Sequence, residues 1–298
     1  GALDFIDNSH EAGKPFFLWW NSTRMHIWTH LQEASEGATG QGIYADGMVE
    51  HDRHVGQLLD KLDELGITDN TIVMYSTDNG AEVMSWPDGG TVPFRSEKNS
   101  TWEGGFRVPE MVRWPGKIPA GTISNGILSH QDWLPTLLAA AGEPDIKEKL
   151  LQGHSAAGKR FNVHIDGVNQ LDMLLGNGPS ARDEIFYFTD DGAMSAVRHN
   201  DWKAIFSVQE AQGFDVWVMP FTNLRVPKLF NLRMDPFEKA DEESINYDRW
   251  LIDHMFVLVP AQQIVARFLA TFKDYPPRQK PSSFTIDQVV EELTPATQ

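Results

Sequence analysis

Residues 69–80, Asp69-Asn-Thr-Ile-Val-Met-Tyr-Ser-Thr-Asp-Asn-Gly80, carry the pattern that decides the fold. A short, β-branched apolar run ends in polar, turn-forming residues, as a buried strand followed by a loop does. Residues 44–65 before it place apolar side chains at helical spacing, and residues 14–20 form another apolar run. The order strand, helix, strand favours a parallel α/β sheet in which residues 71–77 form a central strand.

The segments around this unit predict further regular elements. Residues 2–9 are expected to form a short helix, and Gly66 is placed to end the helix over residues 44–65. Residues 107–115 return to a strand pattern, and Asp132 is positioned to N-cap a helix that Gly142 ends.

The second half of the chain has a different composition. Residues 145–180 are rich in glycine and read as a connecting region. Beyond it, the pattern predicts a small antiparallel sheet followed by a long apolar helix interrupted at Pro260. The strands are expected at 184–189, 195–208 and 228–232, the helix at 247–272, and a Pro-rich surface strap after Tyr275. We therefore divide the chain into domains at 1–145, 146–180 and 181–298.

Composition excludes several classes of protein. A formal net charge of −17 repels nucleic acid and anionic membranes. The absence of cysteine excludes disulfides, zinc-thiolate sites and thiol nucleophiles within these residues. Because no apolar run approaches the roughly 18 residues of a membrane helix, we expect a soluble chain. Since it starts at Gly1 without Met or a basic leader, we also expect the natural N-terminus to lie upstream.

Three polar features lie where ligands bind an open α/β sheet, beyond strand ends. Asp78 and Asn79 offer hard oxygen ligands that suit Ca²⁺ or Mg²⁺, although Asp-Asn-Gly also forms ordinary turns. His26 could protonate a leaving oxygen, or it could be a hydrogen-bonded structural histidine. Lys98 precedes Gly104-Gly105, a pair that permits close backbone approach to a ligand, but a lysine is more often simply solvated.

Residues 14–142 resemble the formylglycine-dependent sulfatases of the alkaline phosphatase-like superfamily in the order and wording of several motifs. The matching runs are Lys14-Pro-Phe-Phe followed by His26, Met48-Val-Glu-His-Asp-Arg-His-Val, Ser76-Thr-Asp-Asn-Gly80, Lys98 with Trp102-Glu-Gly-Gly105, and Ser129-His-Gln-Asp-Trp-Leu-Pro. The resemblance implies an α/β fold made of part of a large sheet with flanking helices, plus a small C-terminal antiparallel sheet with a helix. The family's Pro-His-x-Pro motif is replaced here by Met25-His26-Ile-Trp, so His30 stays an alternative to His26 as the active-site histidine.

The resemblance implies a sulfatase that hydrolyses sulfate monoesters to an alcohol or phenol and sulfate, using a divalent metal. Asp78 and Asn79 would bind Ca²⁺, with Mg²⁺ as the alternative ion. Lys98 would contact a sulfate oxygen, and His26 would assist the leaving group. The helix after Ser129 is structural in this reading, and His51, Asp52 and His54 are assigned to the solvated face or caps of their helix.

The family's Cys- or Ser-x-Pro/Ala-x-Arg motif, whose first residue becomes formylglycine, is not found in these 298 residues. We expect that residue, and further metal ligands, in a preceding segment, and no activity from the isolated chain. Two alternatives stay open: a phosphodiesterase or phosphonate hydrolase of the same superfamily, and a non-catalytic protein that binds sulfated ligands.

The expected partner is a sulfated small molecule or glycan, with no nucleic acid and no membrane. The oligomeric state is undetermined by the sequence. The resemblance favours a bacterial periplasmic or secreted location over the cytoplasm.

Overall fold

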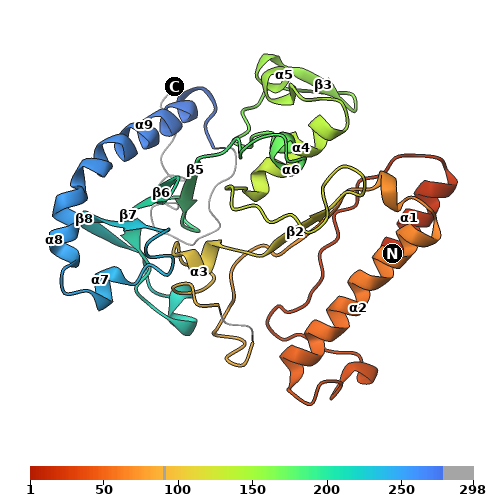
Figure 1. Ribbon diagram of the computed structural model, residues 1–298, viewed down its shortest axis with the longest axis horizontal. Coiled ribbons are helices and arrows are strands. Elements are labelled where there is room, and N and C mark those ends of the chain that lie inside the picture. Colours follow the sequence, from red (N-terminus) through yellow and green to blue (C-terminus); the bar gives the residue numbers. More distant parts are fainter. Residues whose placement is uncertain (90–91, 278–298) are drawn as a thin grey trace, which may run out of the picture. The chain divides into compact units, whose positions relative to one another are not determined.

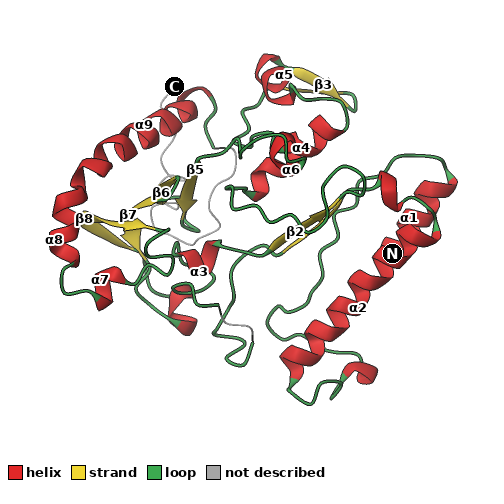
Figure 2. Cartoon of the chain, in the orientation of Figure 1, coloured by secondary structure: helices red, strands yellow, loops and turns green. Residues whose placement is uncertain are grey.

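The computed structural model describes residues 1–89 and 92–277 (Figures 1 and 2). The chain divides into two compact units. Unit 1 comprises Gly1–Pro93, Arg107–Ser124 and Leu174–Gly176. Unit 2 comprises Phe94–Phe106, Asn125–Met173 and the residues from Asn177 onward. The chain therefore leaves unit 1 at Phe94, returns to it at Arg107, and leaves it again after Ser124.

Unit 1 is built on two helices, α1 (Ala2–Glu11) and α2 (Ile43–Glu64). Both expected helices are confirmed, and Gly66 follows α2 with φ of +65°, a conformation that glycine adopts without strain. The first half of α2 does not bury the expected apolar stripe: Met48 is exposed. Its buried side chains are polar, Asp46, Glu50 and His51. The short 3₁₀ turns η1 (Glu33–Ser35) and η2 (Thr68–Asn70) flank α2.

The strands of unit 1 differ from the expectation. β1 (Val73–Ser76) pairs with β2 (Glu110–Arg113), and the pairing is antiparallel, with Val73 opposite Arg113. The prediction that 71–77 would be the central strand of a parallel sheet is therefore wrong within the described residues, because the strand that reaches β1 runs the opposite way.

Residues 14–20 do not form the expected buried strand. Without a paired neighbour among the described residues, the segment has no ladder of backbone hydrogen bonds. Its side chains still alternate: Phe16 packs edge-on against Phe5, whereas Phe17 and Trp19 are exposed. The apolar run thus half-buries one face, with Phe16, Leu18 and Trp20, and exposes the other.

Unit 2 contains a four-stranded antiparallel sheet in the order β5-β6-β7-β8. The strands are β5 (Glu184–Phe188), β6 (Met194–His199), β7 (Trp202–Val208) and β8 (Thr222–Asn231). The expected small antiparallel sheet is confirmed. The stretch 195–208 is two strands rather than one, because the chain turns at Asn200, whose φ is +51°.

The sheet separates two apolar cores by its period-two alternation. On β6, β7 and β8, Ala196, Ile205 and Phe230 face one core, which the Trp102 segment also joins. The alternate positions on the same strands face the other core, which Ala261 and Ile264 of helix α9 (Leu258–Asp274) cover. The segment Phe94–Phe106, with the short helix α3 (Glu103–Phe106), thus covers one face of this sheet and α9 the other (Figure 1).

Shorter elements complete unit 2. Ser129 and Asp132 form a capping box at η3, and Asp132 precedes the expected helix α4 without an N-cap hydrogen bond to it. Its carboxylate is bound instead by the buried Arg182 and by the Val168 N–H. The elements are η3 (His130–Asp132), α4 (Trp133–Ala140), α5 (Ile146–Gln152), the hairpin β3 (His154–Ala156) and β4 (Lys159–Phe161), α6 (Leu171–Leu174), η4 (Gly213–Trp217) and α7 (Ala240–Glu243).

The long C-terminal helix breaks earlier than expected. α8 (Tyr247–His254) and α9 (Leu258–Asp274) are joined by the 3₁₀ turn η5 (Met255–Val257). Pro260 does not interrupt α9, because it lies in the first turn, where no intrahelical N–H bond is lost.

The stretch Tyr247–Asp274 is long and apolar enough to cross a membrane, with a mean hydropathy of 1.5 in an 18-residue window. The expectation that no segment would meet that test is wrong. A single such helix is weak evidence of a membrane span, and one face of α9 packs on the sheet.

The two compact units cut across the division of the chain into domains at 1–145, 146–180 and 181–298, which stays a prediction. Residues 94–106 and 125–145 fold with the four-stranded sheet rather than with the N-terminal helices. The surface strap expected after Tyr275 lies almost entirely outside the described residues.

Candidate functional site

The loop that carries His26 is bound to helix α2. Arg24 donates from Nε to the Glu50 carboxylate at 3.0 Å, and its Nη2 pairs with the same oxygen. The second Glu50 oxygen accepts from the backbone N–H of Gln32 at 3.0 Å. Gly47 lets the loop pack closely, since a Cβ there would lie 2.3 Å from the Met25 sulfur. His26 itself is exposed at the surface of this loop.

Glu50 is charged in spite of its burial. It is 2% exposed, and burial alone would raise its pKa. The Gln32 N–H, the Ser35 hydroxyl and the Arg24 guanidinium outweigh that effect and lower the pKa of Glu50 to about 2. The His26 loop is therefore anchored by a carboxylate that stays ionised over the ordinary pH range.

Asp78 and Asn79 lie directly after β1, as the strand pattern predicts. Asp78 is exposed, and the Thr77 hydroxyl reaches its Oδ1 at 3.4 Å. The Asn79 amide donates to the Gly80 carbonyl at 2.8 Å, which orients the amide and leaves its oxygen without a hydrogen bond from any described residue. Both side chains thus offer oxygens that fit a hard divalent cation, as part of the six to eight ligands that Ca²⁺ takes.

Lys98 lies in a tightly held loop of unit 2. Ser96 and Asn99 on either side adopt left-handed conformations, with φ of +62° and +66°. The Asn99 amide donates to the Val216 carbonyl at 2.8 Å, and the Gly213 N–H donates to the Glu97 carboxylate at 3.0 Å. Among the described residues, the Lys98 ammonium makes no hydrogen bond and no ion pair. The loop therefore holds the backbone at Lys98 in place and leaves its ammonium without a hydrogen bond or an ion pair among the described residues.

Gly104 and Gly105 allow the backbone of the Lys98 loop to approach them closely. The sequence had suggested the close approach of a ligand instead. A Cβ on Gly104 would lie 2.3 Å from the Arg95 carbonyl oxygen, and one on Gly105 would lie 2.5 Å from the Ser100 carbonyl oxygen. The Gly104 N–H also donates to the Arg95 carbonyl at 2.8 Å. The glycine pair allows the Lys98 loop to pack onto α3.

A buried charge cluster lies under the same segment. The Lys203 ammonium, fully buried on β7, is 2.7 Å from Glu238 and 3.1 Å from Glu103, and it donates to the Thr101 carbonyl at 2.8 Å. Tyr187 donates to Glu103 at 2.8 Å. Burial would raise the pKa of both carboxyl groups. Lys203 and the Tyr187 hydroxyl nevertheless lower that of Glu103, whereas that of Glu238 stays raised.

The four predicted site residues are divided between the two units. His26, Asp78 and Asn79 belong to unit 1, and Lys98 belongs to unit 2. Within the described part of unit 1, no hydrogen bond or ion pair joins His26 to Asp78 or Asn79. The metal-binding role of Asp78 and Asn79 and the catalytic roles of His26 and Lys98 therefore stay predictions.

His51 is not on the solvated face of α2 as expected. It is 9% exposed, stacks on Trp20 with a 6° angle between the ring planes, and lies 3.1 Å from the Tyr75 hydroxyl. Burial lowers the pKa of His51. The residue is therefore a neutral structural contact between α2 and β1.

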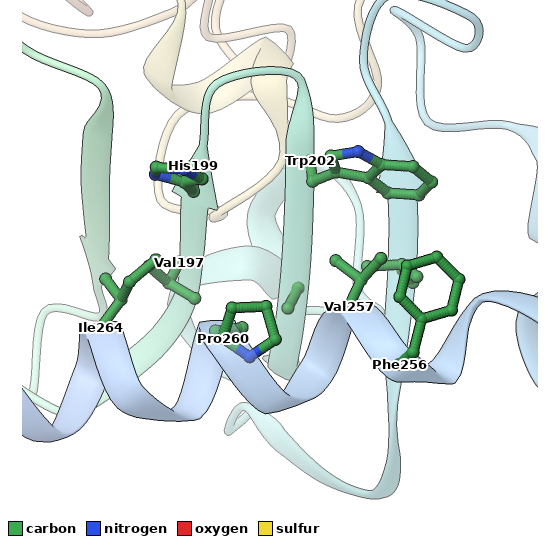
Figure 3. A pocket seen from close by; sticks show the side chains of 10 residues that line it. Val197, His199, Trp202, Phe256, Val257, Pro260 and Ile264 are labelled. Atoms are coloured by element: carbon green, nitrogen blue, oxygen red, sulfur yellow. The ribbon is translucent and has the colours of Figure 1, made fainter.

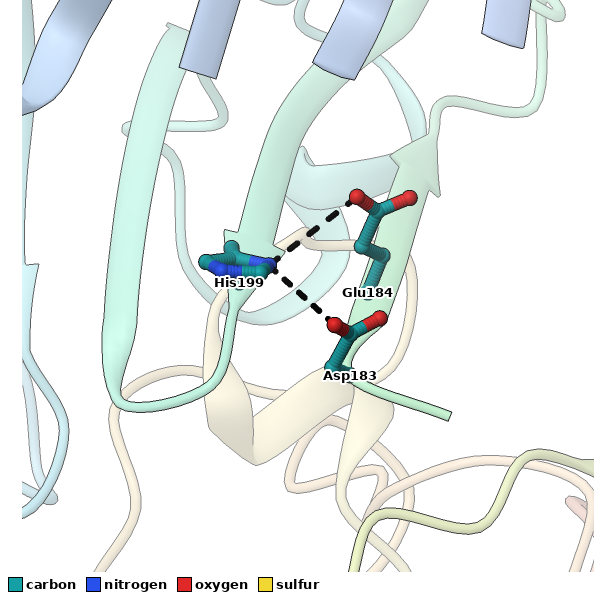
Figure 4. A group of neighbouring side chains, drawn as sticks. All are labelled: Asp183, Glu184 and His199. Carbon is teal, nitrogen blue, oxygen red and sulfur yellow. Dashed lines mark ion pairs between the residues drawn. The ribbon is translucent and has the colours of Figure 1, made fainter. Parts of the chain in front are cut away.

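One group with metal-ligand chemistry lies elsewhere in the described residues, at the β5 and β6 ends of unit 2 (Figure 4). The His199 Nδ1 is 3.9 Å from a carboxylate oxygen of both Asp183 and Glu184. Arg267 also pairs with Glu184 at 3.1 Å. Arg267 already balances the negative charge of Glu184. Asp183 and Glu184 both serve as ion-pair partners of His199.

A cavity of about 230 Å³ lies between the sheet and the η5–α9 segment (Figure 3). Val197, Ala204 and Leu229 line it from the strands, and Pro260 and Ile264 from the helix. Its walls carry no side chain that could neutralise an anion, apart from His199 at its edge. It does not have the chemistry of the site that the sequence predicts.

The sequence did not reveal the buried charged residues that fix the His26 and Lys98 loops. Arg24 and Glu50 lie 26 positions apart, and Lys203 lies 100 positions from Glu103. One signal was available: Asp46, Glu50 and His51 recur on one face of a helix, which is also where buried residues recur. Nothing in the local sequence marks Lys203 as buried.

Comparisons with known proteins agree with the resemblance seen in the motifs. Residues 1–143 match the Sulfatase family. The chain is 34% identical to N-acetylgalactosamine-6-sulfatase of Canis lupus familiaris over 258 residues, covering 80% of this chain and 46% of that protein. It is 32% identical to arylsulfatase A of Bos taurus over 249 residues, with the same coverage.

A solved structure shares the fold over nearly the whole chain. The PsFucS1 sulfatase from Pseudoalteromonas sp. superposes with a TM-score of 0.79 at 29% identity, covering 94% of this chain and 53% of that one. The chain thus spans about half the length of the relatives it matches. The expected partial α/β sulfatase fold is confirmed by this likeness. On the motifs, the family match and the fold together, the chain belongs to the sulfatase family of the alkaline phosphatase-like superfamily.

Proposed function

We propose that this chain forms part of an enzyme that hydrolyses sulfate monoesters, and that Lys98 binds an oxygen of the sulfate. The observation that carries the proposal is the Lys98 loop. In a chain of net charge −17, it holds an ammonium without an ion-pair partner among the described residues, inside the run that matches the Sulfatase family. A sulfate monoester is an anion, so its cleavage needs such a charge at the transferred group.

His26 is proposed to protonate the departing oxygen. It is exposed on a loop that Arg24 and Glu50 hold in place, which combines access to substrate with a defined position. This role needs only that the imidazole reach the leaving oxygen when the ester is bound.

Asp78 and Asn79 are proposed as two ligands of a divalent cation, Ca²⁺ or Mg²⁺. Their oxygens fit such an ion, as the orientation of the Asn79 amide supports. When bound, the cation supplies positive charge to the sulfate oxygens. We place the formylglycine nucleophile and the remaining ligands outside this chain, since the 298 residues hold no Cys- or Ser-x-Pro/Ala-x-Arg motif.

The substrates are proposed to be sulfated small molecules or glycans. Relatives named for N-acetylgalactosamine 6-sulfate and for aryl sulfates both support sulfate esters as the class. We place the protein in the periplasm or outside the cell, a location that cell fractionation would test.

The test uses the complete enzyme that contains this chain. We expect it to hydrolyse 4-nitrophenyl sulfate much faster than 4-nitrophenyl phosphate, and Lys98→Ala to abolish most of that rate. Faster hydrolysis of a phosphate diester, bis(4-nitrophenyl) phosphate, or of a phosphonate monoester, 4-nitrophenyl phenylphosphonate, than of 4-nitrophenyl sulfate would instead support a phosphodiesterase or phosphonate hydrolase. Binding of sulfated ligands with no turnover would support a non-catalytic protein.

A further inference from the structure

The turn that follows β7 exposes an unusual apolar surface. Phe214, Trp217, Val218 and Met219 lie within one short segment and are 66%, 43%, 63% and 54% exposed. Phe214 and Trp217 belong to the 3₁₀ turn η4, which the buried Val216 anchors, and Val218 and Met219 follow it. Clustered exposed apolar side chains on a soluble domain mark a surface that binds something.

This surface adjoins Lys98. The Lys98 ammonium lies 5.6 Å from the centre of the Trp217 ring. That distance is near the outer limit of a cation–π contact, about 6 Å, so the ring holds the ammonium only weakly. The ammonium and much of the indole surface therefore remain open to a ligand.

The segments that carry the two side chains are joined by hydrogen bonds. The residues on both sides of Lys98 bond to η4, Glu97 through the Gly213 N–H and Asn99 through the Val216 carbonyl. Gln209 donates to the same Val216 carbonyl and to that of Met219. The lysine loop and the aromatic turn are thus one hydrogen-bonded structure.

We propose that Lys98 and Trp217 form a two-part subsite for a sulfated sugar ring. The ammonium binds the sulfate, and the exposed indole packs against the apolar face of the ring. This inference rests on the proposed function and adds to it the part of the substrate that is not sulfate.

The experiment measures binding to the 298-residue chain by NMR, following the backbone N–H signals of Asn99 and Gly213, which flank Lys98 and Trp217 and are present in every variant. The probes are galactose 6-sulfate, galactose, inorganic sulfate and phenyl sulfate. We expect the wild-type chain to bind galactose 6-sulfate roughly tenfold more tightly than galactose or inorganic sulfate, since each half of the subsite adds to the other.

Variants separate the two halves. Trp217→Ala should weaken binding of galactose 6-sulfate about tenfold and leave inorganic sulfate within about twofold, whereas Trp217→Phe should retain most of the affinity. Lys98→Gln should weaken both anions. Trp19→Ala is the matched control, because Trp19 is an exposed tryptophan of unit 1.

The outcomes distinguish this inference from the proposed function. If Lys98→Gln weakens both anions but Trp217→Ala weakens neither, the inference fails and the proposed function stands. If Lys98→Gln changes neither, both fail. Tighter binding of phenyl sulfate than of galactose 6-sulfate, or no gain of galactose 6-sulfate over inorganic sulfate in the wild type, overturns the sugar subsite. A change of oligomeric state in Trp217→Ala without a change of affinity also overturns it.

Discussion

The ammonium of Lys203 lies 3.1 Å from the carboxylate of Glu103, and both side chains are buried. This pair joins β7 to α3, directly after the loop that carries Lys98. The Trp-Glu-Gly-Gly run at residues 102–105 is therefore fixed by the buried ammonium of Lys203, which lies 100 residues further along the chain.

Replacement of Lys203 by methionine should destabilise the protein strongly. It leaves the buried Glu238 without a cation and Glu103 with only the more distant Arg198, at 3.7 Å, and breaking a buried pair costs about 3–5 kcal/mol. Urea unfolding monitored by circular dichroism measures the loss. The control is Lys273→Met, at an exposed position, which should change the free energy of unfolding by less than about 0.5 kcal/mol. A wild-type midpoint for Lys203→Met would contradict the pairing.

Replacement of Glu50 by glutamine should make stability less dependent on acid pH. The pKa of Glu50 is about 2 in the folded chain and near 4.5 when unfolded. Its contribution is therefore fully present above about pH 4.5 and is lost as the pH falls towards 2. Glu50→Gln should cost about 2 kcal/mol at pH 7 and progressively less below pH 4.5. Unfolding curves at pH 7 and pH 3 measure the difference, and the exposed Glu36→Gln should show none.

An alanine at Gly104 should disturb the Lys98 loop. The new Cβ would lie 2.3 Å from a backbone oxygen that cannot move freely, so we expect a loss of about 1–3 kcal/mol or more. Thermal unfolding provides the measurement. Gly56→Ala is the matched control, because a Cβ there meets nothing within 4 Å and alanine favours the helix. Equal melting temperatures for the two variants would argue against close packing at Gly104.

In the complete enzyme, His26→Ala and Lys98→Ala should each lower the turnover of 4-nitrophenyl sulfate about a hundredfold or more. The reason is the loss of a proton donor in the first case and of a charge on the sulfate oxygens in the second. Lys117→Ala, at an exposed position of unit 1, is the control. Near-normal rates for His26→Ala would leave His30 as the residue to examine.

Removal of the divalent cation should abolish activity of the complete enzyme, and Asp78→Asn should raise the concentration of Ca²⁺ needed to restore it by roughly tenfold or more. Titration of the chelator-treated enzyme with Ca²⁺ and then with Mg²⁺ makes the measurement. Thr77→Val is a useful comparison, since it removes only the hydroxyl that contacts Asp78. Full activity in the presence of chelator would exclude the metal.

Much of the secondary structure could be predicted from local patterns. The helix over residues 44–65, the strand before Asp78 and the antiparallel sheet after residue 180 follow from periodicity, because hydrophobic spacing reports the geometry of a single element. The direction of β1 pairing could not be predicted, since it depends on which strand reaches β1 and not on its own residues.

The predicted site was accessible to the sequence in part. Asp78, Asn79 and Lys98 were found from their residue types and motif context. The residues that hold the site loops in place, Glu50 and Lys203, could not be found in this way. They are charged residues whose burial depends on partners far along the chain. Trp217 carries no local mark that sets it beside Lys98, and only the hydrogen bonds of Asn99 and Glu97 to the η4 turn bring the two together.

The amino-acid order alone thus determined the family, the principal elements and the chemical nature of the candidate ligands. Each of these is a property of contiguous residues. Tertiary structure alone decided that α2 buries a polar face, that the glycine pair serves the lysine loop, and that Lys98 has an aromatic neighbour. The physical reason is that burial, charge pairing and close packing are relations between side chains distant along the chain, and their free energies exist only once the backbone has brought those side chains together.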